Sequence, residues 1–342
     1  MKRKHTFGLA AGLSLGLLVT ACGADEGNNT ENDPAANNTE NTEENNTEAD
    51  TEENTGNNTA EENNAAEENT EDDAGGEAGG NIGEEIEYTI TGIDAGAGIM
   101  SASDEALEVY GLDDWSITAS SDSAMTQELA TAIENEEPIV VTGWTPHWKF
   151  SEYDLKFLDD PETVYGEAED IHTFVRDGLS DEMPEAYEVL DNFEWSEEDM
   201  GEIMSSIQEG TDESEAARTW VDENEDLVSE WTDGVEEVDG EEISLVFVAW
   251  DSEIASTNMI AHVLEDIGYE VTMDPLEANF MFQAVATGEA DAMVAAWLPL
   301  THEHLVEDYG DDMEDLGANL EGARTGLVVP EYVDIDSIED LQ

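Results

Sequence analysis

Short apolar runs alternate with helix-like patterns after residue 86, and this alternation constrains the fold more than any other feature of the chain. The runs that predict strands are residues 87–93, 138–144, 243–250 and 291–299. The patterns that predict helices are residues 123–137, 252–269 and 277–290. Strands that alternate with helices are typical of the α/β class. Between the two blocks, residues 168–239 are predicted to be mainly helical, with Ser196 and Asp199 capping one helix.

Three of the predicted strands end in a tryptophan, namely Trp144, Trp250 and Trp297. In open α/β sheets, ligands bind in the crevice beyond the carboxyl ends of the strands. One such tryptophan alone would be interpreted as a core or rim residue, but three in the same position predict a shared cleft. The other tryptophans are assigned to packing, except Trp148, which could either back the site or pack.

The segment 94–107 reads as a glycine-rich turn that enters a helix. Backbone N–H groups at the start of a helix lack acceptors, and the positive end of the helix dipole favours an anion. The segment lacks the Gly-Lys-Ser/Thr of a P-loop and the full glycine fingerprint of dinucleotide-binding proteins. Taken alone, such a turn indicates a site only weakly.

The tryptophans and the turn together describe a pocket with two complementary halves. Indole faces attract cations, above all a quaternary ammonium that cannot hydrogen-bond, with about 0.5–2 kcal/mol per contact. The N–H groups of the turn would hold a carboxylate. The pattern therefore favours a small zwitterion with a methylated ammonium group, that is, a betaine.

The charge of the chain excludes several classes of partner. It carries 8 basic against 89 acidic residues, a formal charge of −81 over 342 residues. Nucleic-acid binding needs clustered cations, so we expect no nucleic-acid partner, and an anionic membrane surface would repel the chain. At molar salt the Debye length falls to about 3 Å and the self-repulsion is screened. Because residues 150–342 are themselves densely acidic, we interpret the charge as adaptation of a folded domain to brine.

The N-terminal part predicts export and a lipid anchor. Residues 1–22 have a basic start, an apolar stretch too short for a comfortable membrane span, and an end that resembles a bacterial lipobox. We therefore predict a lipoprotein signal peptide that ends at lipidated Cys22. Cys22 is the only cysteine, which excludes an intramolecular disulfide. Residues 23–85 are rich in Asn, Glu and Thr and are predicted to be a disordered acidic tether.

Several motifs after residue 86 resemble the glycine betaine-binding lipoproteins of ABC importers, of the OpuAC type. The motifs are GIDAGAGIM (92–100), PIVVTGWTPHW (138–148), YDLKFLDDP (153–161), IHTFVR (171–176), AWDSEIASTN (249–258), AWLPLTH (296–302), GLVVPEYV (326–333) and SIEDL (337–341). The resemblance covers nearly all of residues 86–342 and follows the order of the two halves in that type. It implies a two-lobed, periplasmic-binding-protein-like α/β fold over residues 86–342, with the ligand cleft between lobes that close like a hinge.

The resemblance also implies how a ligand is held. The residues that match the family's prism of tryptophans around the trimethylammonium group are Trp144, Trp250 and Trp297. The backbone amides that hold the carboxylate match Gly98 and Ile99, and the histidine that joins them matches His302.

The histidines do not predict a metal site. His302 and His304 lie two residues apart, so they would project apart on a helix, and no cysteine is available beside them. His147 is predicted to orient its loop, whereas His172 and His262 lie in helix-like patterns and are assigned structural roles. We therefore expect neither a metal nor another cofactor.

The sequence as a whole predicts an extracytoplasmic solute-binding protein, lipid-anchored to the outer face of the cell membrane. It would capture glycine betaine, with proline betaine as a second ligand, as a monomer, and deliver it to ABC permease and ATPase subunits for osmoprotection. The first rival is a receptor for choline or carnitine, and the carboxylate-holding set argues against choline. An extracytoplasmic enzyme acting on quaternary amines is disfavoured because no nucleophile–base pair stands out. A structural, cation-sequestering protein would leave the three tryptophans without a role.

Overall fold

The computed structural model describes residues 82–342, which belong to one compact unit. The predicted signal peptide, Cys22 and the tether as far as residue 81 lie outside the described residues. The last four residues assigned to the tether instead form helix α1 (Ile82–Glu85), so the predicted tether boundary at residue 85 is wrong. The reason is that Ile82 is apolar and packs into the buried core. Within residues 82–342, no helix combines the length and the hydrophobicity needed to cross a bilayer.

A mixed sheet runs through the described residues in the order β2-β1-β3-β9-β5-β8-β6-β7, with β4 paired to β9. The strands are β1 (Thr89–Thr91), β2 (Ser116–Thr118), β3 (Val141–Thr145), β4 (Leu155–Phe157), β5 (Glu169–Arg176), β6 (Glu242–Phe247), β7 (Glu270–Pro275), β8 (Ala292–Leu298) and β9 (Met313–Pro330). Pairing is parallel within β2-β1-β3 and within β8-β6-β7. It is antiparallel wherever β5 or β9 takes part.

Helices connect and cover these strands. They are α2 (Gly98–Val109), α3 (Asp122–Asn135), α4 (Lys149–Glu152), α5 (Leu179–Glu182), α6 (Pro184–Asn192), α7 (Glu197–Gln208), α8 (Glu213–Glu223), α9 (Glu225–Trp231), α10 (Asp251–Asp266), α11 (Ala278–Thr287) and α12 (Glu303–Tyr309), with 3-10 turns at Gly310–Asp312 and Ile338–Leu341. The alternation of strands and helices confirms the predicted α/β class.

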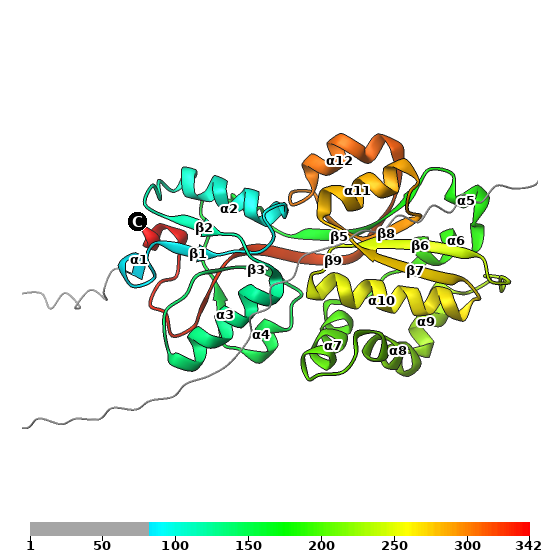
Figure 1. Ribbon diagram of the computed structural model, residues 1–342, viewed down its shortest axis with the longest axis horizontal. Helices are drawn as coiled ribbons and strands as arrows, with labels where there is room; N and C mark the ends of the chain where they lie inside the picture. The colour runs from blue at the N-terminus through cyan, green and yellow to red at the C-terminus, as the bar shows by residue number, and fades with distance from the viewer. Residues whose placement is uncertain (1–81) are drawn as a thin grey trace, which may run out of the picture. The chain divides into compact units, whose positions relative to one another are not determined.

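Strand β9 belongs to two lobes. Its first part, through Ala323, pairs with β5, and its last part, from Arg324, pairs with β3 and β4. We call β1–β4, their helices and the end of β9 the first lobe, and β5–β8, α5–α12 and the start of β9 the second lobe (Figure 1). The chain leaves the first lobe before β5 and returns in β9, so the second lobe is an insertion in the sequence of the first.

Most of the predicted elements that shape the crevice are present, with shifted ends. Strands β3 and β8 and helices α3, α10 and α11 lie where the apolar and helical patterns place them. The strand predicted at 243–250 ends at Phe247, so Trp250 lies three residues later and is the N-cap of α10. The capping box of Ser196 and Asp199 at the start of α7 is confirmed.

The prediction that residues 168–239 are mainly helical is wrong at their beginning, because β5 occupies Glu169–Arg176. His172 therefore lies in a strand, not in a helical pattern, and its Nδ1 lies 2.9 Å from Oδ1 of Asp315 on β9. Buried and half-buried side chains alternate along the first part of β5, as expected for a strand between two others. His262 does lie in a helix, α10.

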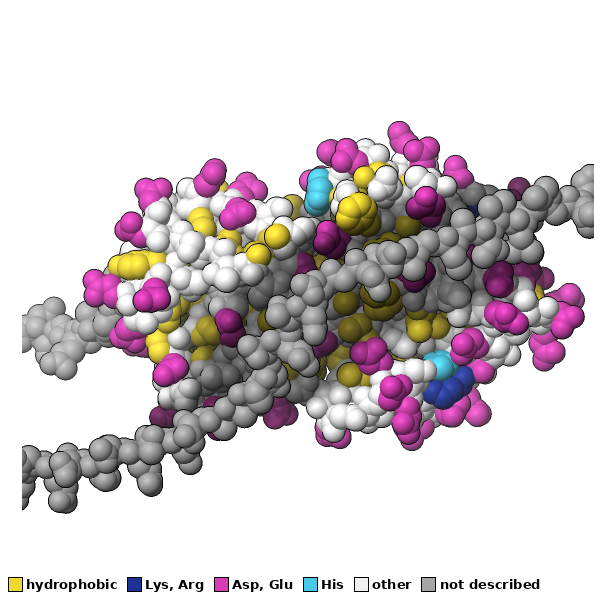
Figure 2. Space-filling model, viewed as in Figure 1, with side chains coloured by type: hydrophobic (Ala, Val, Ile, Leu, Met, Phe, Trp, Pro, Cys, Tyr) yellow, Lys and Arg dark blue, Asp and Glu magenta, His cyan; other side chains and the backbone are white. Residues whose placement is uncertain are grey.

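The described surface is strongly acidic. In the space-filling view, Asp and Glu side chains are spread over the visible face, whereas Lys and Arg are almost absent from it (Figure 2). Several of the few basic residues are already paired, such as Arg176 with Asp291 at 2.7 Å and Arg218 with Asp266 at 2.9 Å. The folded part itself therefore carries the charge imbalance, as the composition predicts.

Candidate functional site

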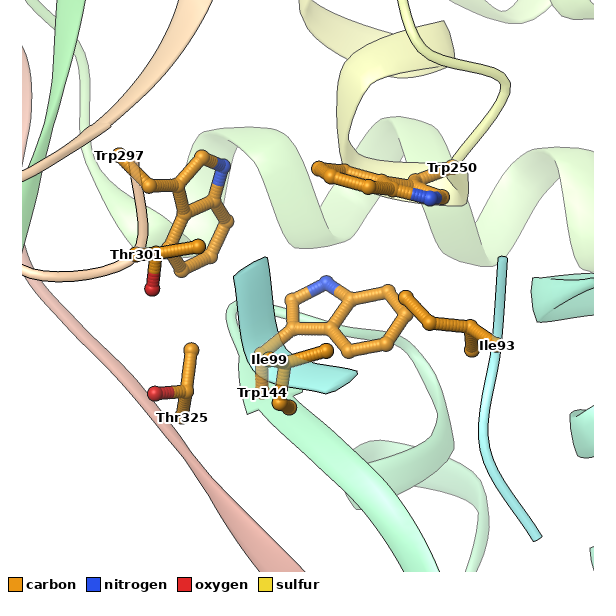
Figure 3. A pocket seen from close by; sticks show the side chains of 7 residues that line it. All are labelled: Ile93, Ile99, Trp144, Trp250, Trp297, Thr301 and Thr325. Atoms are coloured by element: carbon orange, nitrogen blue, oxygen red, sulfur yellow. The ribbon is translucent and has the colours of Figure 1, made fainter. Parts of the chain in front are cut away.

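The three predicted tryptophans line one pocket between the lobes (Figure 3). The space within the pocket, including solvent at its opening, amounts to about 260 Å³. Its lining residues are Ile93, Ile99 and Trp144 from the first lobe, Trp250, Trp297 and Thr301 from the second, and Thr325 from β9. The lining contains no side chain that is charged at neutral pH, so the pocket offers a ligand mainly ring faces and methyl groups.

Each tryptophan is placed by a different element. Trp144 is the fourth residue of β3, Trp297 is the sixth of β8, and Trp250 caps α10. The rings are almost fully buried, with exposed fractions of 3%, 2% and 5%. The ring centroids of Trp144 and Trp250 are 6.2 Å apart and their planes are tilted by 53°, so the two rings are not stacked on each other.

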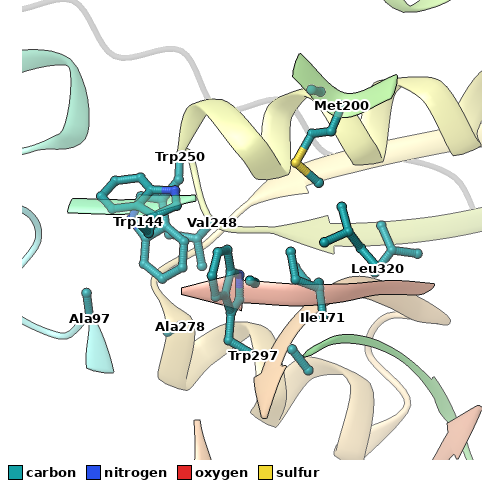
Figure 4. Close-up of a cluster of buried hydrophobic side chains, with 14 of the residues drawn as sticks. Ala97, Trp144, Ile171, Met200, Val248, Trp250, Ala278, Trp297 and Leu320 are labelled. Atoms are coloured by element: carbon teal, nitrogen blue, oxygen red, sulfur yellow. The ribbon is translucent and has the colours of Figure 1, made fainter. Parts of the chain in front are cut away.

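The tryptophan rings join the pocket to the core of the second lobe. Trp297 is paired across the sheet with Ile171 of β5. Figure 4 shows Trp297 between the other two indoles and a group of apolar side chains that includes Ile171 and Leu320. Because this group is buried, the Trp297 wall of the pocket is anchored in packed side chains on its far side.

Hydrogen bonds from the indole N–H groups fix the orientation of each ring. Trp144 Nε1 donates to Ser252 Oγ at 3.2 Å, and Trp250 Nε1 donates to Asp94 Oδ2 at 3.3 Å. Both bonds cross from one lobe to the other. Trp297 Nε1 instead donates within the second lobe, to a buried carboxylate oxygen of Glu253 at 2.7 Å. The pocket is therefore complete only while the two lobes are in contact.

His302 lies behind the pocket with one ring nitrogen unused. Its Nδ1 accepts the backbone N–H of Trp297 at 3.0 Å, which leaves the proton on Nε2. That Nε2 is buried and has no hydrogen-bond partner among the described residues. Burial, with a smaller effect from His304, lowers the pKa of His302 to about 3, so the ring is neutral. A neutral imidazole with a free N–H is a suitable donor to a ligand oxygen.

The glycine turn packs against the residue that precedes His302. Gly98 is the first residue of α2, so its N–H and that of Ile99 have no intrahelical acceptor. A Cβ on Gly98 would lie 2.0 Å from the carbonyl oxygen of Thr301, which no side chain could tolerate. The absence of a side chain at Gly98 therefore lets the start of α2 approach the turn at Thr301 closely.

Four of the six predicted ligand-binding residues, the three tryptophans and Ile99, line the pocket directly. Gly98 and His302 do not line it but flank it at Thr301. The role of all six in ligand binding stays a prediction. Trp148, which the sequence left open, lies outside the lining and donates its indole N–H to Asp251.

A buried ionic cluster that sequence reasoning missed lies beside the pocket. One ligand-type atom each from Asp122, His147 and Asp251 lies within 4.8 Å of the others, a spacing that could hold a metal ion. However, His147 Nδ1 accepts the N–H of Lys149, and its Nε2 lies 3.2 Å from Asp122. Burial, together with the neighbouring Lys149, lowers the pKa of His147 to about 4. Existing contacts thus account for this cluster without an ion.

Lys149 is the unexpected member of this cluster. Its side chain is fully buried, and its Nζ has no hydrogen-bond partner among the described residues. The ammonium nitrogen lies 4.0 Å from the ring centroid of Trp144, so one face of that indole already meets a basic group. Burial lowers the pKa of Lys149 to about 7, against the opposing effect of Asp122 and Asp251.

Sequence reasoning also missed the acceptors of the indole N–H groups, which are Asp94, Ser252 and Glu253. A local signal exists for two of them. Ser252 and Glu253 lie shortly after Trp250, in the first turn of α10, where polar side chains are common. Position alone could not show that both are buried.

The sequence of this chain matches a known protein family. A profile of the OpuAC family, described as the substrate binding domain of ABC-type glycine betaine transport systems, matches residues 46–223 and 241–342. This chain belongs to that family. Glycine betaine/carnitine transport binding protein GbuC of Listeria monocytogenes is 56% identical over 265 residues, which are 77% of this chain and 88% of that protein.

Solved structures of the same kind are also similar to parts of the chain. Lactococcal OpuAC, closed and complexed with glycine betaine, is 47% identical with a TM-score of 0.43, over 44% of this chain and 59% of that chain. The glycine/betaine/L-proline-binding protein of Borrelia burgdorferi is 39% identical with a TM-score of 0.42, over 44% and 57%. With the family established and two lobes joined through β9, the predicted two-lobed, periplasmic-binding-protein-like α/β fold is confirmed. The family description names a substrate-binding part of a transport system, not an enzyme.

Proposed function

We propose that this chain is the extracytoplasmic receptor of an ABC importer and captures glycine betaine between its lobes. The observation that carries the proposal is the pocket of three indoles, with no side chain charged at neutral pH in its lining. A trimethylammonium group cannot hydrogen-bond, so it gains most from aromatic faces, to which it is attracted electrostatically. The family membership and the name of the GbuC relative support the same ligand.

The carboxylate of the ligand would lie at the other end of the pocket. The free Nε2–H of His302 and the N–H groups of Gly98 and Ile99 are the donors proposed for it. Because His302 is neutral, these donors hold a carboxylate by hydrogen bonds and by the dipole of α2 rather than by a formal positive charge. This arrangement favours betaines over choline, which has no carboxylate.

Carnitine is the second candidate ligand, because the name of the GbuC relative includes it. Calorimetric titration of residues 82–342 with glycine betaine, proline betaine, carnitine and choline, in molar salt, tests the proposal. We expect glycine betaine to bind and choline to bind far more weakly. Choline binding as tight as betaine binding would refute the carboxylate site, and the absence of any binding would refute the receptor function.

The end of the N-terminal apolar stretch, at Cys22, resembles a bacterial lipobox. We propose that Cys22 carries the lipid that holds the protein at the outer face of the membrane, where it delivers ligand to the permease and ATPase subunits. Mass spectrometry of the membrane fraction would detect the acylated cysteine, and Cys22→Ser should release the protein.

We also propose that the acidic surface adapts the protein to concentrated salt. Lowering the salt from molar to about 0.01 M lengthens the Debye length from about 3 to about 30 Å, so that charges across a whole lobe repel. The melting temperature of residues 82–342 should therefore fall steeply at low salt, and betaine should oppose the fall by mass action. A melting temperature that does not depend on salt would refute the adaptation but not the ligand.

A further inference from the structure

Glu253 is a buried carboxylate for which the fold offers no counter-charge. Its side chain, in the first turn of α10, is fully buried. Its oxygens accept the indole N–H of Trp297 at 2.7 Å and the hydroxyls of Ser252 and Ser256 at 3.4 Å each. Among the described residues, no Lys, Arg or His forms an ion pair with it.

The other buried acidic side chains of residues 82–342 have different surroundings. Asp122 is paired with His147, and its carboxylate also accepts the backbone N–H of Asp251. Glu169 accepts the backbone N–H groups of Leu300 and Thr301, at 2.8 and 2.6 Å, and so holds the turn that follows β8. These two have evident structural roles, whereas Glu253 makes its shortest hydrogen bond to a ring that lines the ligand pocket.

We propose that Glu253 is a specificity-determining residue, whose carboxylate is the buried counter-charge that makes the pocket prefer a quaternary ammonium to a neutral group of the same shape. The inference rests on the proposed function. An isolated carboxylate in a low-dielectric interior is strongly disfavoured, and a cation nearby relieves that cost. A cationic ligand against Trp297 would place its charge only one indole away from this carboxylate.

The expected effect is large enough to measure. The carboxylate of Glu253 and the ammonium of the ligand would be separated by an indole, its hydrogen bond and a ligand contact, roughly 8 Å in all. At an effective dielectric constant of about 20, the attraction between two unit charges at this distance strengthens binding by about 30-fold. Hydrogen bonding to a carboxylate also polarises the indole and makes its face more negative. Trp144 offers the opposite case, since its N–H meets a neutral hydroxyl and its ring already meets Lys149.

The experiment compares two ligands that differ in charge and not in shape. Glycine betaine is matched by 3,3-dimethylbutanoate, in which carbon replaces the ammonium nitrogen and the carboxylate is kept. Glu253→Gln can still accept the N–H of Trp297 but carries no charge. In molar salt, at a pH well above the Glu253 pKa of about 7 so that the carboxylate is charged, we expect this variant to lose about 30-fold in betaine affinity and almost nothing in dimethylbutanoate affinity. Glu265→Gln, which removes an exposed charge from the far end of the same helix, is the matched control and should change neither affinity.

The possible outcomes distinguish an electrostatic role of Glu253 from a purely structural one. If Glu253 only holds Trp297 in place, the variant lowers both affinities alike, and the proposal is overturned; an unchanged betaine affinity overturns it as well. If wild-type protein binds no betaine at all, the proposed function fails instead. Should Glu253→Gln not fold, the ratio of the two affinities is measured in wild-type protein at different pH values.

The direction in which the affinity ratio should change with pH follows from the charge of Glu253. Burial raises the pKa of Glu253 to about 7, against the lowering effect of its bonds from Trp297, Ser252 and Ser256. Below that pH the carboxyl is neutral, so the preference for betaine over dimethylbutanoate should fall. Two other groups near the pocket titrate over the same range: Lys149, with a pKa of about 7, gains its charge, and Asp251, whose pKa burial raises to about 6, loses its charge. The measurement is therefore repeated in Lys149→Met and in Asp251→Asn. A preference that does not change with pH, or whose change disappears in either variant, overturns the proposal.

Discussion

Residues 82–342 contain two clusters of buried tryptophans, which share residue type and burial but differ in what their rings contact. The pocket cluster consists of Trp144, Trp250 and Trp297, and the helical cluster consists of Trp195, Trp220 and Trp231 with Phe193. All six indoles are between 2% and 5% exposed. Residue type and burial alone therefore could not distinguish a binding site from a core.

The difference lies in what the rings contact. In the helical cluster the rings cover one another, with Trp220 and Trp231 stacked at 6.3 Å, and all come from the second lobe. The N–H groups of Trp195 and Trp220 have no hydrogen-bond partner among the described residues. In the pocket cluster every N–H has an acceptor, two of them in the opposite lobe, and the rings face a common space. Rings that are oriented by polar partners around a space are suited to a ligand, whereas rings that fill each other's space are suited to stability.

The largest expected effect is a loss of stability when a ring of the helical cluster is removed. Trp231→Ala removes a fully buried ring and should lower the free energy of unfolding by about 3–5 kcal/mol, because a cavity remains. Urea denaturation in molar salt measures it, and Trp231→Phe should lose less. Betaine affinity of the folded protein should not change, so a loss of affinity without a loss of stability would contradict the comparison.

At the pocket cluster, removal of a ring should reduce ligand affinity more than stability. Trp250→Ala should weaken betaine binding by about 3 kcal/mol, from a desolvated cation–π contact of about 2 kcal/mol and lost apolar contact. Trp250→Phe should keep part of the affinity because a smaller ring face remains. Because Trp250 donates across the lobes, its removal should destabilise the ligand-free protein less than Trp231→Ala does. Equal losses of affinity for Ala and Phe would indicate packing instead.

His302 should have an intermediate effect. His302→Ala removes the proposed donor to the ligand carboxylate and should weaken betaine binding by about 1.5–3 kcal/mol. Its pKa of about 3 keeps the ring neutral near pH 7, so titration of His302 itself should not alter binding there. Calorimetry checks both statements. An affinity equal to that of the wild type would exclude His302 from the site.

The smallest effect should come from an acceptor across the lobes. Ser252→Ala leaves the N–H of Trp144 without its hydroxyl partner and should weaken betaine binding by about 0.5–1.5 kcal/mol. Ser229→Ala, which removes a hydroxyl bonded within α9, is the matched control and should leave binding unchanged. If both variants bind like the wild type, the indole N–H bonds across the lobes do not contribute to capture.

The pocket tryptophans could be found from the sequence because strands and helices are local patterns. Apolar runs gave β3 and β8, and a ring at a strand end must lie near the crevice. Strand β9 could not be recognised over its full length, because its first part, through Ala323, contains Gly317, Gly322 and several charged residues and reads as a loop. Strand β9 is held extended by pairing, first with β5 and then, in its last part, with β3 and β4. These contacts join segments far apart in the chain, so no local sequence pattern predicts them.

The polar partners of the site were hidden for a similar reason. Glu253 and Lys149 are charged side chains in an acidic, exposed-looking sequence, and local patterns assign such residues to the surface. Both are fully buried because segments far apart in the chain enclose them. The pairing of Trp297 with Glu253, 44 residues apart, likewise has no signal in the sequence.

The insertion of the second lobe has a mechanical consequence. Both ends of the described chain lie in the first lobe, where the indole N–H of Trp115 donates to the carbonyl of Leu341 at 2.9 Å. Tension applied between the two ends would therefore load the first lobe, while the second lobe is stretched only after β9 separates from β3 and β4. In a single-molecule pulling measurement, the first lobe should rupture first, and the second lobe should lengthen in a later step.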